Sequence, residues 1–156
     1  MAIELKALMS ALHALGAVVW VGGMFVIYTA LRPAAAENLD RGHRLTLWAG
    51  VLRRFFAWVW AAMIVLVATG FEMIFVDFGG FGMVDPDMHV MTTIGLVMAV
   101  IFLVIFFGPY RAMRQAVHAH AWDTAAHAHA WVRRLVAANL VLGLINVAIG
   151  AGGRFL

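Results

Sequence analysis

The chain has 156 residues, of which 65% are apolar and only 12% are charged, and its mean hydropathy is +0.94. A soluble domain of this length needs more polar surface than this composition supplies, so we predict an integral membrane protein. The absence of cysteine excludes disulfides and thiolate metal sites, and the isoelectric point of about 10.2 does not indicate nucleic-acid binding, because the arginines gather at the ends of apolar segments.

Four apolar segments follow one another along the chain, at about residues 5–31, 55–78, 88–110 and 135–155, and we expect helices over about residues 5–31, 55–78, 86–114 and 131–155. Each reaches the ~20 residues that a helix needs to cross a hydrocarbon core of ~30 Å. Strands of a membrane barrel would be shorter and would alternate in polarity, which these segments do not. We therefore predict an all-α integral membrane protein in which residues 1–156 form a single four-transmembrane-helix bundle.

The first segment contains His13, Gly16 and Trp20, whose spacing of three and four places them on one helix face. Small and polar residues on one face are typical of helix contacts within lipid. Ala34-Ala35-Ala36 resembles the cleavage site of a signal peptide. However, the apolar run is too long for a signal core and Glu4 stands where a basic region is expected, so we expect the segment to be retained.

The basic residues are distributed unevenly among the connections. Arginines occur between the first and second segments (residues 32–54) and between the third and fourth (residues 111–134), whereas residues 77–87 contain acids and no Lys or Arg. The positive-inside rule therefore places both basic connections in the cytoplasm. It predicts both termini on the outer (periplasmic) side of a bacterial-type inner (cytoplasmic) membrane.

Histidines recur in the last connection, where the pentapeptide HAHAW occurs twice, at residues 118–122 and 127–131. On an unbroken helix His120 and His127 would share a face, as would His118 and His129. They could then gather a metal ion on the cytoplasmic side, although their spacing matches no closed zinc or copper motif. The alternative is that these histidines are ordinary polar residues of a solvated connection.

Four ionisable residues lie deeper, one in each segment: His13, Glu72, His89 and Arg154. Asp85-Pro86-Asp87, which has the form of a helix start, precedes His89. Counting from the arginines at ~1.5 Å per residue places all four within ~6 Å of one level, near the outer boundary of the hydrocarbon core. Ionisable groups at membrane depth are costly, so we regard them as candidate functional residues.

Two inward histidines on separate helices are typical of bundles that hold b-type haem. We expect His13 and His89 as axial ligands of the iron, Gly16 and Trp20 as pocket wall, and Arg154 as the partner of a propionate. Glu72 would pair with a cation such as Arg154 or relay a proton. Two alternatives stay open: another metal at the histidines, or a His13 that only bonds between helices and an interfacial His89.

Several stretches resemble known families. LHALGAVVWVGGMFV is similar to the first helix of CopD-type copper-resistance membrane proteins and of the related HemJ-type protoporphyrinogen oxidases. RRFFAWVWAAMIVLVATGF resembles their second helix, and FGPYRAMRQAV and RRLVAANLVLGLINVA continue the likeness. The resemblance implies a four-helix unit in which His13 is the helix-1 histidine and a haem or metal ligand. HemJ-type enzymes carry a lysine where this chain has Met91, which argues against protoporphyrinogen oxidase activity, whereas CopD-type proteins imply copper movement.

Our hypothesis from the sequence is a membrane protein that holds haem b and serves electron transfer or a membrane-bound oxidation, with a redox partner or quinone. One alternative is a copper transport or tolerance protein of the CopD type. The other is a non-catalytic membrane subunit or assembly factor. In each case the bilayer is the surrounding solvent, no nucleic acid is expected as a partner, and a homo-oligomer is compatible with the composition.

Overall fold

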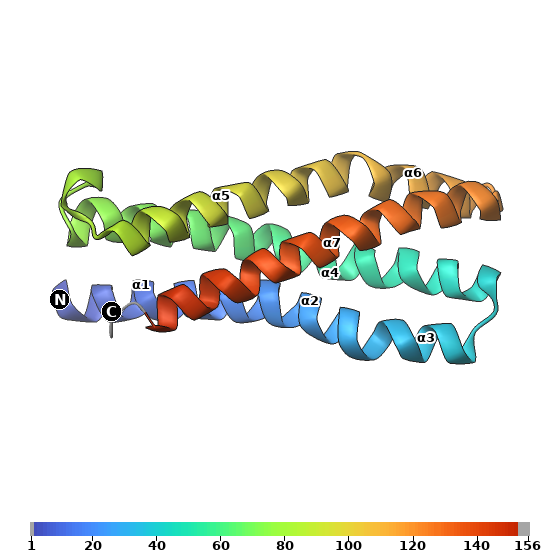
Figure 1. Ribbon diagram of the computed structural model, residues 1–156, viewed down its shortest axis with the longest axis horizontal. Helices are drawn as coiled ribbons and strands as arrows, with labels where there is room; N and C mark the ends of the chain where they lie inside the picture. Colours follow the sequence, from blue (N-terminus) through green and yellow to red (C-terminus); the bar gives the residue numbers. More distant parts are fainter. Residues whose placement is uncertain (1, 153–156) are drawn as a thin grey trace.

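Residues 2–152 are described by a computed structural model, in which long helices lie side by side along one axis (Figure 1). Among these residues there is no β-strand, and four helical segments are long and apolar enough to cross a membrane. The predicted all-helical fold with four membrane-spanning segments is confirmed. The four segments are Ile3–Asn38, Arg41–Asp77, Pro86–His118 and Trp122–Gly152.

Each segment is built from one or more helical elements. The first combines α-helical and π-helical turns, which are α1 (Ala2–Ala17), η1 (Val18–Gly22), α2 (Gly23–Val26), η2 (Ile27–Leu31) and α3 (Arg32–Asn38). The second consists of α4 (Arg41–Glu72) and a π-helical end, η3 (Met73–Asp77). A short 3₁₀ turn, η4 (Phe81–Met83), leads to α5 (Pro86–Phe107) and α6 (Pro109–His118), and α7 (Trp122–Gly152) follows.

Large apolar side chains cover the outside of the bundle. Leu15 is 60% exposed, Trp58 65%, Ile64 61% and Val100 59%, and these residues lie on three of the four segments. Exposing this much apolar surface to water is unfavourable, whereas contact with lipid tails carries no such free-energy cost. The exposed surface therefore agrees with the hydropathy of the segments, and a bilayer is the environment of this protein.

The helices continue past the apolar segments at the end that carries most of the arginines. α4 begins at Arg41 instead of near Phe55, and α7 begins at Trp122 instead of near Trp131. Asp40 caps α4, because its carboxylate accepts a hydrogen bond of 2.9 Å from the His43 backbone N–H. The part of α4 before Phe55 adds ~20 Å of helix. A small core of Leu45, Ala116 and Ala125 packs these extensions together.

The helix is interrupted once within the third segment, at Gly108, and the chain turns sharply between the third and fourth segments. Pro109 has no backbone N–H, and the helix bends at Gly108, where a Cβ atom would lie 2.8 Å from the Val104 carbonyl oxygen. At the end of α6 the chain turns through His120, which has a positive φ of 54°. The helix is therefore broken between His118 and Trp122, and the unbroken helix considered for the HAHAW repeats does not exist.

Neighbouring segments pack antiparallel with a constant register. Along α1 and the end of the second segment (α4 and η3), Lys6 lies by Asp77, Ser10 by Met73 and His13 by Thr69. Along α5 and α7, added Cβ atoms at Gly150, Gly95 and Gly143 would contact Met91, Asn146 and Met98 respectively. Between these pairs lies the core, in which the rings of Trp20, Phe56 and Phe102 meet edge to face.

The start of α1, the end of α7 and the connection between α4 and α5 lie together at the left of Figure 1. We call this the N-terminal end of the bundle. The α3–α4 and α6–α7 connections lie at the opposite end, which we call the arginine-rich end.

Candidate metal site at the N-terminal end of the bundle

His13 is held against α4 by one hydrogen bond. Its Nδ1 lies 2.8 Å from Thr69 Oγ1, and Thr69 Oγ1 lies 2.7 Å from the Val65 carbonyl oxygen. A carbonyl oxygen can only accept, so the single hydroxyl proton of Thr69 goes to Val65. Thr69 must then accept the Nδ1 proton of His13. This arrangement fixes the imidazole tautomer and leaves the lone pair of His13 Nε2 available for a metal ion.

Soft sulfur donors lie within one helical turn of this histidine. Ser10 Oγ donates to Met73 Sδ at 3.9 Å, one turn from the His13–Thr69 bond on both helices. Met9 is half-buried and precedes His13 by four residues, so it lies near the same face of α1. Imidazole with thioethers is a donor set that suits Cu(I). Sequence reasoning missed Met9 and Met73, although their four-residue spacing from His13 and Thr69 was a usable signal.

Two acids accompany the site. Asp77 forms an ion pair of 3.0 Å with Lys6, one turn beyond the Ser10–Met73 contact. Glu72 is half-buried, and its Oε2 is enclosed without a hydrogen-bond partner among the described residues. Arg154, the partner expected for Glu72 and for a haem propionate, lies outside the described residues. Glu72 is therefore a buried acceptor that a proton or a bound cation could satisfy.

His89 lies at the same level as His13 but is exposed. A Cβ atom added to Gly143 of α7 would contact Val21 of η1, so these two residues lie opposite each other. Eight residues closer to the N-terminal end, the same antiparallel register places His13 opposite Ala151. The α5–α7 register places Ala151 opposite Val90, the neighbour of His89. The registers thus support the common depth expected from the sequence. However, the His89 ring stacks on Phe81, with centroids 6.0 Å apart, and no described contact joins it to His13.

The expected haem pocket is filled by protein side chains. A Cβ added to Gly16 would come within 3.0 Å of Leu66, and one added to Gly150 within 2.8 Å of Met91. Trp20 is 4% exposed and packs edge to face on Phe102, so it belongs to the core. These glycines permit close helix contacts and leave no slot for a porphyrin. The residues between His13 and His89 therefore do not fit a haem group in this arrangement.

The four histidines near the arginine-rich end are not gathered into one cluster in the described part of the chain. Within residues 2–152, no three His, Asp or Glu side chains are placed to hold an ion together. His118, His120 and His127 are exposed, and His120 lies against Trp122. His129 is partly buried and packs on Trp48, with ring centroids 5.2 Å apart. Because the helix is broken at His120, the four histidines do not lie on one continuous helix, and a metal site at these residues stays a prediction.

A row of donor atoms lies along the α5–α7 interface. Met91 and Met98 of α5 face Gly150 and Gly143 of α7. On α7, Asn146 lies between Gly143 and Gly150, and Asn139 lies one turn before Gly143. The Oδ1 atom of each asparagine is buried without a hydrogen-bond partner in the described part of the chain. Asn139 is only 1% exposed. Unsatisfied amide oxygens at membrane depth are costly, so they point to a ligand, ion or water that approaches them.

Comparison with known families gives one match. The family model described as "CopD: Copper resistance protein D" matches residues 49–152. This range includes Thr69, Glu72 and Met73 of the candidate site and the α5–α7 interface. No curated protein and no solved structure matches the chain.

Proposed function

Because the chain belongs to the copper resistance protein D family, we propose that it binds copper at the N-terminal end of its bundle and passes the ion into the membrane. His13 is the proposed imidazole ligand, and Met73 and Met9 are the proposed thioether ligands. The observation that carries the proposal is the His13–Thr69 hydrogen bond, which leaves Nε2 outside that bond, with the Met73 sulfur one helical turn away along the same pair of helices.

Copper in its reduced, monovalent state matches these donors best. Thioether and imidazole ligands favour Cu(I), whereas Mg²⁺ and Ca²⁺ prefer carboxylate and carbonyl oxygens. Zinc sites are usually closed by four nitrogen, sulfur or carboxylate ligands, which the described residues do not gather here. The copper ion is therefore the proposed substrate of the site and is bound loosely enough to leave it.

The route inward follows the α5–α7 interface. Met91, Asn146, Met98 and Asn139 alternate thioether and amide donors along it, and both amide oxygens lack other partners. An ion moving between adjacent weak sites can enter and leave each one, which is the requirement for conduction. We propose that the N-terminal end faces the periplasmic side of a bacterial-type inner membrane, since the arginines lie at the other end.

Haem binding with a redox role has less support. His89 is exposed on Phe81, and the spaces beside Gly16 and Gly150 are filled by Leu66 and Met91. A non-catalytic subunit or assembly factor would use the same four-helix fold but would not need an imidazole whose orientation is fixed by a hydrogen bond. These two alternatives make different predictions for the purified protein.

Copper loading of detergent-purified protein under reducing, anaerobic conditions tests the proposal. We expect wild type to retain about one Cu(I) per chain and His13→Ala to lose it. His89→Ala is the matched control, because His89 lies at the same level but away from the site, and it should load like wild type. Equal loading of His13→Ala and wild type would refute the site. A Soret band in the purified protein would favour haem, and an unloaded chain with a co-purifying partner would favour the assembly role.

A further inference from the structure

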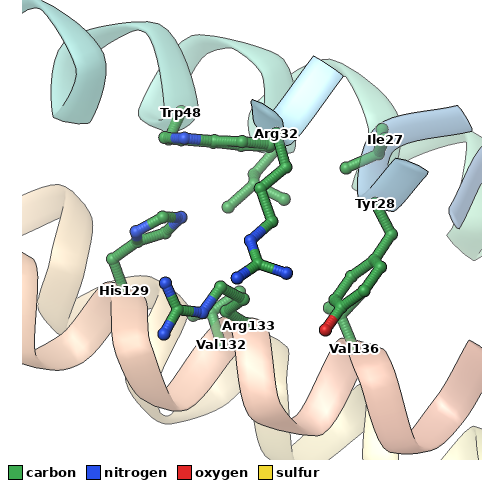
Figure 2. A pocket seen from close by; sticks show the side chains of 9 residues that line it. Ile27, Tyr28, Arg32, Trp48, His129, Val132, Arg133 and Val136 are labelled. Carbon is green, nitrogen blue, oxygen red and sulfur yellow. The ribbon is translucent and has the colours of Figure 1, made fainter. Parts of the chain in front are cut away.

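The arginine-rich end contains a cleft between the first segment, α4 and α7. It is a small cleft of about 30 Å³, and Tyr28, Arg32, Trp48, His129 and Arg133 line it together with apolar side chains. In Figure 2 the side chains of Tyr28 and Arg32 descend from η2 and α3, Trp48 comes from α4, and His129 and Arg133 rise from α7. Residues from three segments that are distant in sequence thus converge on one space.

No Asp or Glu among residues 2–152 lines this cleft, so the described residues supply no counter-charge within it. Arg32, Arg44 and Arg133 all lie close enough to act electrostatically on His129. The ion pairs that the described residues make at this end are Arg41–Asp123 and His43–Asp40, and neither contributes a carboxylate to the cleft. Arg32 contacts the Tyr28 ring at 4.9 Å instead of an acid. A half-enclosed group of cations without counter-charges is stabilised by a bound anion.

The shape of the cleft indicates the chemical class of that anion. Guanidinium groups match phosphate oxygens in geometry as well as charge. Ile27 lines the cleft five residues before Arg32, and Val136 three residues after Arg133, both on the side towards the middle of the membrane. A phosphate beside the arginines with a hydrocarbon chain along these apolar residues would satisfy both parts of the lining. A free inorganic phosphate would use only the charged part.

We propose that this cleft binds the phosphate headgroup of an anionic phospholipid at the membrane boundary. Basic pockets between transmembrane helices near the cytoplasmic surface are suited to such headgroups. The inference does not depend on copper, because the cleft lies at the opposite end of the bundle from His13. A bound lipid would bridge the first segment and α7 at a place where the protein supplies no ion pair.

Arg133 and Arg134 provide a matched pair for the test. Arg133 lines the cleft, whereas its neighbour Arg134 lies over the Trp131 ring at 5.4 Å and is not part of the lining. We expect phosphatidylglycerol to bind wild type and Arg134→Gln equally in native mass spectrometry. Binding to Arg133→Gln and Arg32→Gln should weaken about tenfold, which is the loss expected from one charge-assisted pair. Equal binding by all four proteins overturns the proposal.

A second measurement identifies the source of the phosphate and does not depend on the variants folding. Thermal unfolding of wild type is compared in nanodiscs of phosphatidylglycerol, in nanodiscs of phosphatidylcholine, and in phosphatidylcholine with added inorganic phosphate. Stabilisation by phosphatidylglycerol alone supports the lipid headgroup. Equal stabilisation by inorganic phosphate assigns the cleft to a free anion and overturns the lipid proposal, as does equal stability in all three conditions.

Discussion

Replacing Thr69 by valine removes the hydroxyl group that accepts the Nδ1 proton of His13 and leaves a side chain of similar shape. Thr69 is 4% exposed, so water cannot replace the lost acceptor. In the native arrangement the hydroxyl lies 2.8 Å from Nδ1 and fixes which imidazole nitrogen carries the proton. In Thr69→Val either nitrogen can be protonated and the ring is free to rotate, so the Nε2 lone pair is no longer presented in one direction.

The expected effect on copper binding exceeds the expected effect on stability. Loss of a hydrogen bond that orients a metal ligand weakens metal binding by about 10–100-fold, or roughly 1.4–2.8 kcal/mol. Hydrogen bonds between membrane helices contribute about 0.6 kcal/mol on average to stability. Thr69→Val should therefore unfold at nearly the wild-type midpoint but bind Cu(I) much more weakly. Thr69→Ser retains a hydroxyl group at the same position and should bind copper within a few-fold of wild type.

Competition with a chromogenic Cu(I) chelator measures the affinity, and thermal unfolding of the same samples without copper measures stability. Two results would refute the reasoning. If Thr69→Val and Thr69→Ser bound copper alike, the Thr69 hydroxyl would not orient a ligand. If the affinity fell only in proportion to a large loss of stability, the hydrogen bond would hold the helices together and have no separate role in metal binding.

Three further predictions concern packing, the proposed route and a helix cap. Gly23→Ala should destabilise the bundle by about 1–3 kcal/mol, because the added Cβ atom would overlap the Phe55 ring. Gly22 has open space beside it, so Gly22→Ala should be close to neutral in the same unfolding assay. Equal effects of the two substitutions would contradict the packing described for Gly23. Asn139→Leu removes a buried amide oxygen without a partner, so stability should be unchanged or higher while copper flux into proteoliposomes falls, and unchanged flux would exclude Asn139 from the route. Hydrogen bonds from the His43 backbone and side chain lower the pKa of Asp40 below its ordinary value of 3.8. The stabilisation of α4 by this cap should therefore be fully present above pH 3.8 and be lost as the pH falls through the lower pKa of the folded state. The amide resonance of His43 should titrate with this midpoint in wild type and not in Asp40→Asn, and a midpoint at or above 3.8 would contradict the cap.

The membrane architecture could be predicted because lipid imposes a simple requirement on sequence. Four apolar segments of sufficient length define four spans, and the arginines mark one end of each. The extensions of α4 and α7 could not be found in this way, since hydropathy reports only the part of a helix that lies in lipid. Asp40 followed by His43 and Arg44 was a visible start for α4, but the packing of Leu45, Ala116 and Ala125 depends on contacts between distant segments.

The candidate site was predicted only in part, for reasons that differ between residues. His13 stood out because an imidazole at membrane depth is costly. Met73 did not, because a methionine in an apolar helix has the same appearance whether it packs or binds a metal. The depth of His89 followed from counting residues, but the direction of its ring depends on Phe81, which belongs to an irregular connection. Glycines in membrane helices indicate close approach, and sequence alone does not distinguish a bound group from the side chains of Leu66 and Met91.

X-ray absorption spectroscopy of the Cu(I)-loaded protein identifies the atoms bound to copper and therefore tests whether His13 and Met73 are its ligands. We expect one imidazole nitrogen together with thioether sulfur around the ion in wild type, and loss of the imidazole contribution in His13→Ala. Sulfur scattering should weaken in Met73→Leu. A copper environment without imidazole, or one that is identical in wild type and His13→Ala, would contradict the proposed site.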